Sequence, residues 1–247
     1  MSTPEKTVGD GITLDAACVT LGGQNILCDL NLVLNERRIA IVGRNGSGKS
    51  TLLRLIAGLI PATEGRVRVD GIDPYADRRS LLTRLGILFQ NPDHQILFPT
   101  VGEELAFGLT QLGQAKSEVA EKVRAHLARL GCADWEKRSV ATLSQGQRHW
   151  LCLQAVLMME PATLLLDEPL AGLDLPTQAR LRRQFDALPQ RLITITHDPA
   201  SAKGADRVIW IDDGKVRADG AAKLVLPAFV QAMTTMGARD ADTHLPD

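Results

Sequence analysis

The sequence contains no apolar run long enough to cross a membrane. Its longest runs, such as Ala162 to Leu166 and Leu192 to Thr196, have the length of β-strands, whereas a membrane-spanning helix needs about 20 apolar residues. The first ten residues are polar and lack the apolar core of a signal peptide. We therefore expect a cytoplasmic protein that does not cross a membrane by itself.

Paired cysteines and a basic surface signature are also missing. The four cysteines stand apart from one another with no CxxC pair, which argues against a zinc ribbon or a redox dithiol. The 28 Lys and Arg residues are balanced by 29 Asp and Glu residues, giving a net charge of −1. Nucleic acid is thus disfavoured as a partner, because binding to a phosphate backbone usually requires clustered positive charge.

The composition is that of one globular domain with a sizeable core, at 247 residues and 45% hydrophobic content. Short β-type runs between glycine-rich turns predict an antiparallel β layer near the N-terminus, and they are Ile12 to Leu21, Leu27 to Leu34 and Arg66 to Val69. Other strand-like runs alternate with helical ones, which is typical of a parallel α/β sheet. These runs are Arg38 to Val42, Leu85 to Phe89, Thr163 to Leu166, Leu192 to Thr196 and Val208 to Ile211.

A helical segment interrupts this α/β pattern. Residues 100–159 show no convincing strand, and Val119, Val123 and Leu127 place an apolar stripe on one helix face before Gly131. We predict a single domain over residues 1–247. Its parts are an α/β core with the antiparallel layer (11–95 and 160–220), an inserted helical subdomain (96–159), and a short C-terminal helix and tail (221–247).

The segment from Gly43 to Ser50 matches the GxxxxGK[ST] pattern and lies between a predicted strand and the predicted helix Ser50 to Leu59. Such a loop holds phosphates with backbone N–H groups, which only glycine lets come close enough. A glycine turn with a solvated lysine is the alternative, and the placement between strand and helix disfavours it. The predicted nucleotide-binding residues are Gly43, Arg44, Asn45, Gly46, Ser47, Gly48, Lys49, Ser50 and Thr51.

Two acidic residues, Asp167 and Glu168, end the apolar run Thr163 to Leu166. Asp167 can orient the ligand shell of a magnesium ion, and Glu168 can polarise an attacking water. Taken alone, the pair could be two solvated acids. The phosphate loop upstream and Pro169 downstream favour phosphoryl transfer.

The segment from Leu143 to Gln147 opens a helical run and reads first as a capping box, with Ser144 as N-cap and Gln147 at N3. Its position, after the helical segment and before the acidic strand, makes the chain resemble the ABC ATPase family. The LSGGQ signature of that family is matched here by LSQGQ, with Gln145 in place of a glycine. The resemblance covers almost the whole chain and implies a P-loop NTPase fold that binds ATP and Mg²⁺ and hydrolyses ATP.

Further family elements follow in order along the chain. Gln90 resembles the Q-loop glutamine, and the resemblance makes it a magnesium ligand together with Ser50 and Asp167. Asp174 is the last residue of a segment that resembles the D-loop. His197 resembles the switch histidine, which assists Glu168 in catalysis. The resemblance also implies a homodimer or heterodimer of ATPase chains. In it, the phosphate loop of one chain faces the signature residues of the other, which are Ser144, Gln145, Gly146 and Gln147.

The chain departs from the family where an aromatic residue usually stacks on adenine, because the matching position is Leu21. Stacking of a base on an aromatic ring contributes roughly 1 to 3 kcal/mol. We therefore predict weak discrimination between nucleotide bases.

The segment from Gln90 to Gly108 is similar to the corresponding segment of energy-coupling factor (ECF) importers for vitamins and metal ions. This similarity implies a transmembrane coupling subunit and a substrate-binding membrane subunit as partners, and a peripheral location on the cytoplasmic face of the inner membrane. The implied interface residues are Pro92, Asp93, His94, Gln95 and Ile96. The short C-terminus and the segment from Glu36 to Gly43 look most like the ATPases of dedicated biotin importers; cobalt or nickel importers and ordinary ABC transporters are the alternatives.

Two other classes fit less well. ABC ATPases of DNA repair or translation usually carry a long coiled-coil insertion or two tandem ATPase units, and neither is found here. A P-loop kinase or GTPase would not require the LSQGQ segment, and the NKxD-type guanine motif of GTPases is missing.

Overall fold

The computed structural model describes residues 11–237, and within it the chain divides into two compact units. The first, here called the sheet unit, comprises residues 11–76 and 191–237, and the second, the helical unit, comprises residues 77–190. The polar tail predicted after the last helix lies outside the described residues.

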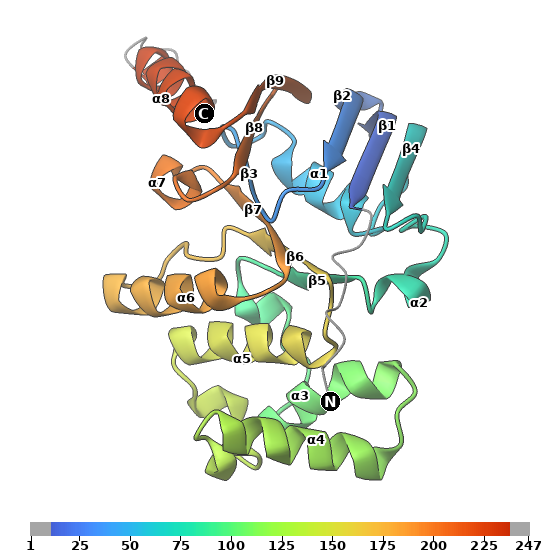
Figure 1. The fold of residues 1–247 in the computed structure, drawn as a ribbon, viewed down its shortest axis with the longest axis vertical. Helices are drawn as coiled ribbons and strands as arrows, with labels where there is room; N and C mark the ends of the chain where they lie inside the picture. The colour runs from blue at the N-terminus through green and yellow to red at the C-terminus, as the bar shows by residue number, and fades with distance from the viewer. Residues whose placement is uncertain (1–10, 238–247) are drawn as a thin grey trace, which may run out of the picture. The chain divides into compact units, whose positions relative to one another are not determined.

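An antiparallel layer opens the sheet unit (Figure 1). It consists of β1 (Ile12–Leu21), β2 (Gln24–Leu34) and β4 (Glu64–Val69), in the order β2-β1-β4. Alternate residues of β1, such as Ile12 and Leu14, are buried, because successive side chains of a strand point to opposite faces. The predicted antiparallel layer is confirmed.

The other strands of the sheet unit run in the order β7-β3-β8-β9. Both β7 (Arg191–Thr196) and β8 (Arg207–Asp212) lie parallel to the central strand β3 (Arg38–Val42), whose apolar residues are almost completely buried. Near-continuous apolar strands are typical of parallel sheets covered on both faces. The helices of this unit are α1 (Lys49–Ile56), α7 (Pro199–Ala202) and α8 (Ala222–Gly237).

Two details of the sheet unit differ from the sequence prediction. Strand β9 (Lys215–Gly220) was not predicted; it pairs with β8 through a two-residue turn at Asp213 and Gly214, whose φ angles are 45° and 73°. Helix α1 ends at Ile56 rather than Leu59, because Gly58 adopts a φ of 66°. A Cβ at Gly58 would lie 2.0 Å from the carbonyl oxygen of Pro74, so the tight turn requires glycine.

The helical unit contains two parallel strands, β5 (Leu85–Leu88) and β6 (Thr163–Asp167), and a cluster of helices (Figure 1). Its core lies between α3, α4 and α5, where the predicted stripe of Val119, Val123 and Leu127 is buried and Trp135 meets Trp150 at a ring distance of 5.5 Å. The helices are α2 (Arg78–Leu81), α3 (Val101–Gln111), α4 (Lys116–Arg129), α5 (Gln145–Met158) and α6 (Leu175–Ala187), with the 3₁₀ turns η1 (Pro92–His94), η2 (Ala133–Trp135) and η3 (Val140–Thr142).

None of the helices within residues 11–237 combines the length and apolar character that a membrane span requires. All four cysteines lie in this part of the chain and are free thiols.

Candidate functional site

The predicted phosphate loop joins β3 to α1 in the sheet unit and is shaped by close backbone approaches. A Cβ at Gly43 would lie 2.3 Å from the carbonyl oxygen of Ile211, and one at Gly48 would lie 2.8 Å from Leu27. Gly48 is also the N-cap of α1, with a φ of 102° and no side chain capping the helix. The first N–H groups of α1 are therefore not satisfied by a capping side chain, as an anion-binding helix start requires.

The turn between β8 and β9 braces this loop. The Gly214 N–H donates to the carbonyl of Ser47 (3.1 Å), and the Arg44 guanidinium forms ion pairs with Asp212 (3.4 Å) and Asp213. The hydrogen bond to Asp213 raises the pKa of Arg44 above its usual value. The sequence analysis missed this support, although an Asp-Gly pair between strand-like runs is a hairpin signal.

Inside the loop, Lys49 is buried and its ammonium group donates to the carbonyl oxygens of Gly43 (2.7 Å) and Arg44 (2.8 Å). The Ser47 hydroxyl is buried and has no hydrogen-bond partner among the described residues. Ser50 and Gly46 are exposed. The loop thus presents a lysine, an unsatisfied hydroxyl and helix N–H groups in one place.

His197 lies at the same edge of the sheet unit as the phosphate loop. It follows Thr196, which is paired with Val42, the residue that precedes Gly43. The His197 side chain is exposed, and its neighbour Asp198 caps α7 by accepting the N–H groups of Ala200 (2.9 Å) and Ser201 (3.1 Å). The parallel register therefore brings His197 and the phosphate loop to one edge.

In the helical unit, the signature segment forms the capping box that its sequence predicts. The Gln147 N–H donates to the Ser144 hydroxyl (3.3 Å), and the Ser144 N–H donates to the Gln147 side-chain oxygen (2.9 Å). Ser144 and Gln145 are exposed at the start of α5. The Ser144 hydroxyl accepts in the cap and keeps its own O–H as a donor.

The start of α5 packs closely against the start of α6. A Cβ at Gly146 would lie 2.8 Å from the Thr177 methyl group, so this position has no room for a side chain. Asp174 caps α6 by accepting the Thr177 N–H (3.0 Å), and hydrogen bonding from Thr177 lowers the pKa of Asp174. The structure thus brings the signature segment and the predicted D-loop together.

The predicted interface segment forms the 3₁₀ turn η1 after β5. The Gln95 side chain holds the turn by accepting the Phe89 N–H (3.1 Å) and donating to the Ile87 carbonyl (3.3 Å). Asp93 and His94 are exposed, Gln95 and Ile96 are half-buried, and Pro92 is buried. Gln90, just before the turn, is exposed.

Asp167 and Glu168 stand at the end of β6, half-buried, and Glu168 has a φ of 46°, which is uncommon for a residue with a side chain. The Glu168 carbonyl accepts the Ala171 N–H (3.0 Å). The chain therefore turns sharply directly after the strand, which leaves both carboxylates at the strand end.

Comparison with known proteins identifies the family. The sequence profile described as "ABC transporter" matches residues 27–171. The biotin transport ATP-binding protein BioM of Rhodobacter capsulatus is 48% identical over 225 residues, covering 90% of this chain and 96% of that protein. The energy-coupling factor transporter ATP-binding protein EcfA1 of Leuconostoc mesenteroides is 36% identical, covering 85% of this chain and 80% of that protein.

Among solved structures, cbiO1 from Clostridium perfringens, part of the ABC transporter complex cbiONQ, is similar with a TM-score of 0.72 and 28% identity. The similarity covers 93% of this chain and 96% of that one.

The chain belongs to the ABC transporter family.

It is an ATP-binding subunit with the α/β P-loop NTPase fold, which confirms the fold class and the family expected from the sequence. Membership in the ABC family implies nucleotide binding. The geometry of the phosphate loop described above also fits a nucleotide phosphate. Magnesium at phosphate sites is usually held by one or two protein side chains together with phosphate oxygens. Ser50, Gln90 and Asp167 carry a hydroxyl, an amide and a carboxylate, and the oxygen atoms of these groups can bind Mg²⁺.

One further apolar residue of this ABC subunit lies beside the interface segment. Leu97 is 65% exposed, and its backbone N–H donates to the Glu104 carboxylate (2.9 Å), which also accepts the N–H of Phe98 (2.9 Å). The sequence analysis missed Leu97, although the apolar run Ile96 to Phe98 directly follows the polar residues of η1.

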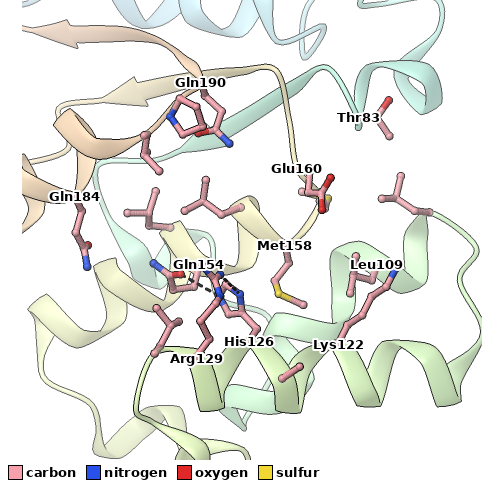
Figure 2. Close-up of a pocket in the computed structure, with 18 of the residues that line it drawn as sticks. Thr83, Leu109, Lys122, His126, Arg129, Gln154, Met158, Glu160, Gln184 and Gln190 are labelled. Carbon is pink, nitrogen blue, oxygen red and sulfur yellow. Dashed lines mark hydrogen bonds between the residues drawn. The ribbon is translucent and has the colours of Figure 1, made fainter. Parts of the chain in front are cut away.

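A cavity of about 960 Å³ also lies in the helical unit, and none of the predicted site residues lines it (Figure 2). His126 lies at its wall, with Nε2 3.0 Å from the Gln154 side-chain oxygen and Nδ1 3.0 Å from the Arg129 guanidinium. Since arginine can only donate, Nδ1 accepts and Nε2 carries the hydrogen of a neutral imidazole. Burial lowers the pKa of His126, which also favours the neutral ring.

Proposed function

We propose that this chain is the ATPase that energises import of a vitamin or metal ion, with biotin as the favoured cargo, through a transporter of the energy-coupling factor type. The observation that carries the proposal is the 48% identity to the biotin transport ATP-binding protein BioM over nearly the whole length of both chains. The cargo is handled by membrane partners, since no site described in this chain is built to bind it.

The proposed catalytic machinery is divided between the two units. Gly43 to Thr51 hold the phosphates of ATP, and Lys49 contacts them directly. Glu168 directs water onto the γ-phosphate and His197 steadies that geometry. Ser50, Gln90 and Asp167 would hold Mg²⁺, which would neutralise charge on the phosphates.

Two chains are required for a complete site in this proposal. The exposed capping-box end of α5 resembles an anion-binding surface, since a helix start with a serine O–H favours negative charge. We assign Ser144, Gln145, Gly146 and Gln147 to the ATP held by the phosphate loop of a second chain. ATP binding closes the pair, Asp174 lies at the contact, and hydrolysis reopens it.

The membrane partner is proposed to bind the segment from Pro92 to Ile96, with Leu97 added from the structure. Leu97 is 65% exposed and lies beside the polar residues of this segment, and protein interfaces combine an apolar centre with a polar rim. The chain would then sit at the cytoplasmic face of the inner membrane. The proposed domain division is a core of 11–95 and 160–220, a helical subdomain of 96–159 and a C-terminal part of 221–247.

Co-purification tests the proposal. The tagged chain is expressed with the membrane proteins encoded beside it, purified in detergent and analysed by mass spectrometry. We expect a transmembrane scaffold and a small membrane protein loaded with biotin. Recovery of a cobalt- or nickel-loaded partner would change the cargo, and recovery of one large permease pair would contradict the ECF type.

The interface is tested in the same purification with two matched leucines. Leu97→Asp should lower recovery of the scaffold at least fivefold. Leu224→Asp, in α8 and 69% exposed, is the control and should leave recovery unchanged. Equal recovery with both variants would contradict the assigned interface.

A further inference from the structure

A buried histidine links the Q-loop to the signature helix. His149 lies in the second turn of α5 and is 0% exposed. Its Nε2 lies 3.0 Å from the carbonyl oxygen of Gln90, and its Nδ1 lies 3.2 Å from the carbonyl oxygen of Gln145. A buried imidazole is costly unless it is hydrogen-bonded. A neutral ring has one N–H to donate, and the shorter distance assigns that hydrogen bond to the Gln90 carbonyl, 59 residues away in the chain.

Two neighbours on α5 contact the same segment. The Arg148 guanidinium donates to the Asp93 carboxylate (2.7 Å), and the Cys152 thiol lies 3.9 Å from the Pro92 carbonyl oxygen. Burial raises the pKa of Cys152 to about 12, so the thiol keeps its hydrogen and can act as a weak donor. Three side chains from a five-residue stretch of α5 therefore contact residues 90–93.

The helix that makes these three contacts begins at the signature segment. Ser144 and Gly146 precede His149 by five and three residues in or at the start of the same helix. A hydrogen-bonded helix moves as a unit over so short a distance, so a shift of residues 90–93 must displace the start of α5 or break the three contacts.

We propose that His149 is a positioning residue that transmits displacement of the Pro92 to Ile96 segment by a membrane partner to the signature residues Ser144 and Gly146. This inference rests on the proposed function for the identity of the partner. The link itself is a property of the isolated chain and is testable without the partner.

The link is tested first by amide hydrogen exchange of the isolated chain. The N–H groups of residues 94–96 donate to backbone carbonyls at η1, for example from Gln95 to Pro92 (3.0 Å), and the Asp93 N–H donates to the Asn91 side chain (2.9 Å). His149→Met removes the donor at similar size and should speed exchange of these amides at least tenfold. His149→Gln, whose amide can reach the Gln90 carbonyl, should stay within threefold of the parent chain.

A second test uses a charge reversal at a less buried pair, because a substitution of the buried His149 could change exchange simply by unfolding the protein. Asp93 and Arg148 are 59% and 31% exposed, so changing them threatens the fold less. Arg148→Asp should speed exchange in residues 93–96, and the double variant Arg148→Asp with Asp93→Arg should restore it. If neither His149→Met nor Arg148→Asp changes exchange in this segment, the inference is overturned.

Transmission is then measured as the ratio of ATP hydrolysis in the complete membrane complex to that of the isolated chain. His149→Met should lower this ratio at least threefold, and His149→Gln should preserve it. If ATP hydrolysis is no faster in the parent complex than in the isolated chain, this result would count against the proposed function, and the hydrogen-exchange result would be unaffected. Normal stimulation of both the parent and the His149→Met complexes would overturn the inference alone.

Discussion

The residues that the proposed function assigns to the sheet unit and to the helical unit are positioned by different means. In the sheet unit, the phosphate loop and His197 are placed by strand register and by backbone contacts, such as Gly43 against Ile211. In the helical unit, three of the motif segments begin at caps of helical segments: Asn91 caps η1, Ser144 caps α5 and Asp174 caps α6. A cap is a structural role, yet it also leaves polar groups at an exposed helix start, where they are available to a ligand.

This difference suggests how the two units respond to change. A phosphate loop braced by Gly214 and by the Arg44 ion pairs is prebuilt, so it should bind nucleotide in one chain alone. In the proposed function, the signature segment of the helical unit contributes to nucleotide binding only when a second chain arrives. Variants of the phosphate loop should therefore change nucleotide affinity, and variants of Glu168 and of the signature segment should change turnover.

The largest expected effect lies in the helical unit. Glu168→Gln removes the proposed base and should lower the rate of ATP hydrolysis about 100- to 10,000-fold, with nucleotide affinity within about threefold of the parent chain. Phosphate release and nucleotide binding are measured on the same preparation. A variant that turns over at the normal rate would remove Glu168 from its assigned role.

The next effect belongs to the sheet unit. Leu21 is 46% exposed at the end of β1, and Leu21→Tyr should restore a stacking surface for adenine. The expected tightening of ATP binding is about 5- to 150-fold, from roughly 1 to 3 kcal/mol of stacking. Calorimetry with ATP and GTP measures both affinity and base preference; unchanged affinity for both would refute the stacking argument.

An effect of similar free energy tests the contact between α5 and α6. Gly146→Ala should lower the free energy of unfolding by about 1 to 3 kcal/mol, because its methyl group meets the stiff Thr177 side chain at 2.8 Å. Adding Thr177→Ser removes the clashing methyl group and should recover most of that loss. Denaturant unfolding of the parent chain and the two variants decides this, and no recovery in the double variant would show that the cost is not steric.

The smallest effect concerns His126, at the cavity wall. Its pKa is lowered in the folded protein, so the unfolded chain binds more protons just below pH 6.5, and stability should fall as pH drops through 6.5 toward the folded pKa. His126→Gln should flatten this part of the pH profile of unfolding, and His94→Gln, at an exposed site, should not. Identical profiles for all three proteins would contradict the buried neutral imidazole.

The contiguous motifs could be predicted from the sequence because each is a local signal. Glycines between a predicted strand and a predicted helix indicate the phosphate loop. Ser144, followed by Gln147 three residues later, indicates the capping box. Strand β9 could also have been predicted, because an Asp-Gly pair between strand-like runs is typical of a two-residue hairpin turn, and Asp213 and Gly214 form such a turn.

Contacts between distant parts of the chain could not be predicted in this way. The ion pair of Arg44 with Asp213 joins residues 169 apart, and the contact of His149 with Gln90 joins residues 59 apart. No pattern within a strand or helix encodes such a pair, since it depends on how the elements pack. The 65% exposure of Leu97 likewise depends on how the elements pack, and no local pattern predicts it.

The central claim is that one chain holds only part of each ATP site. Light scattering of Glu168→Gln with and without saturating ATP and Mg²⁺ measures the mass of the particle directly, with Glu168→Gln combined with Ser144→Arg as the control. The account predicts a dimer only with ATP, and a monomer that still binds ATP when Ser144 is replaced. A Glu168→Gln protein that binds ATP and stays monomeric at saturation would contradict it.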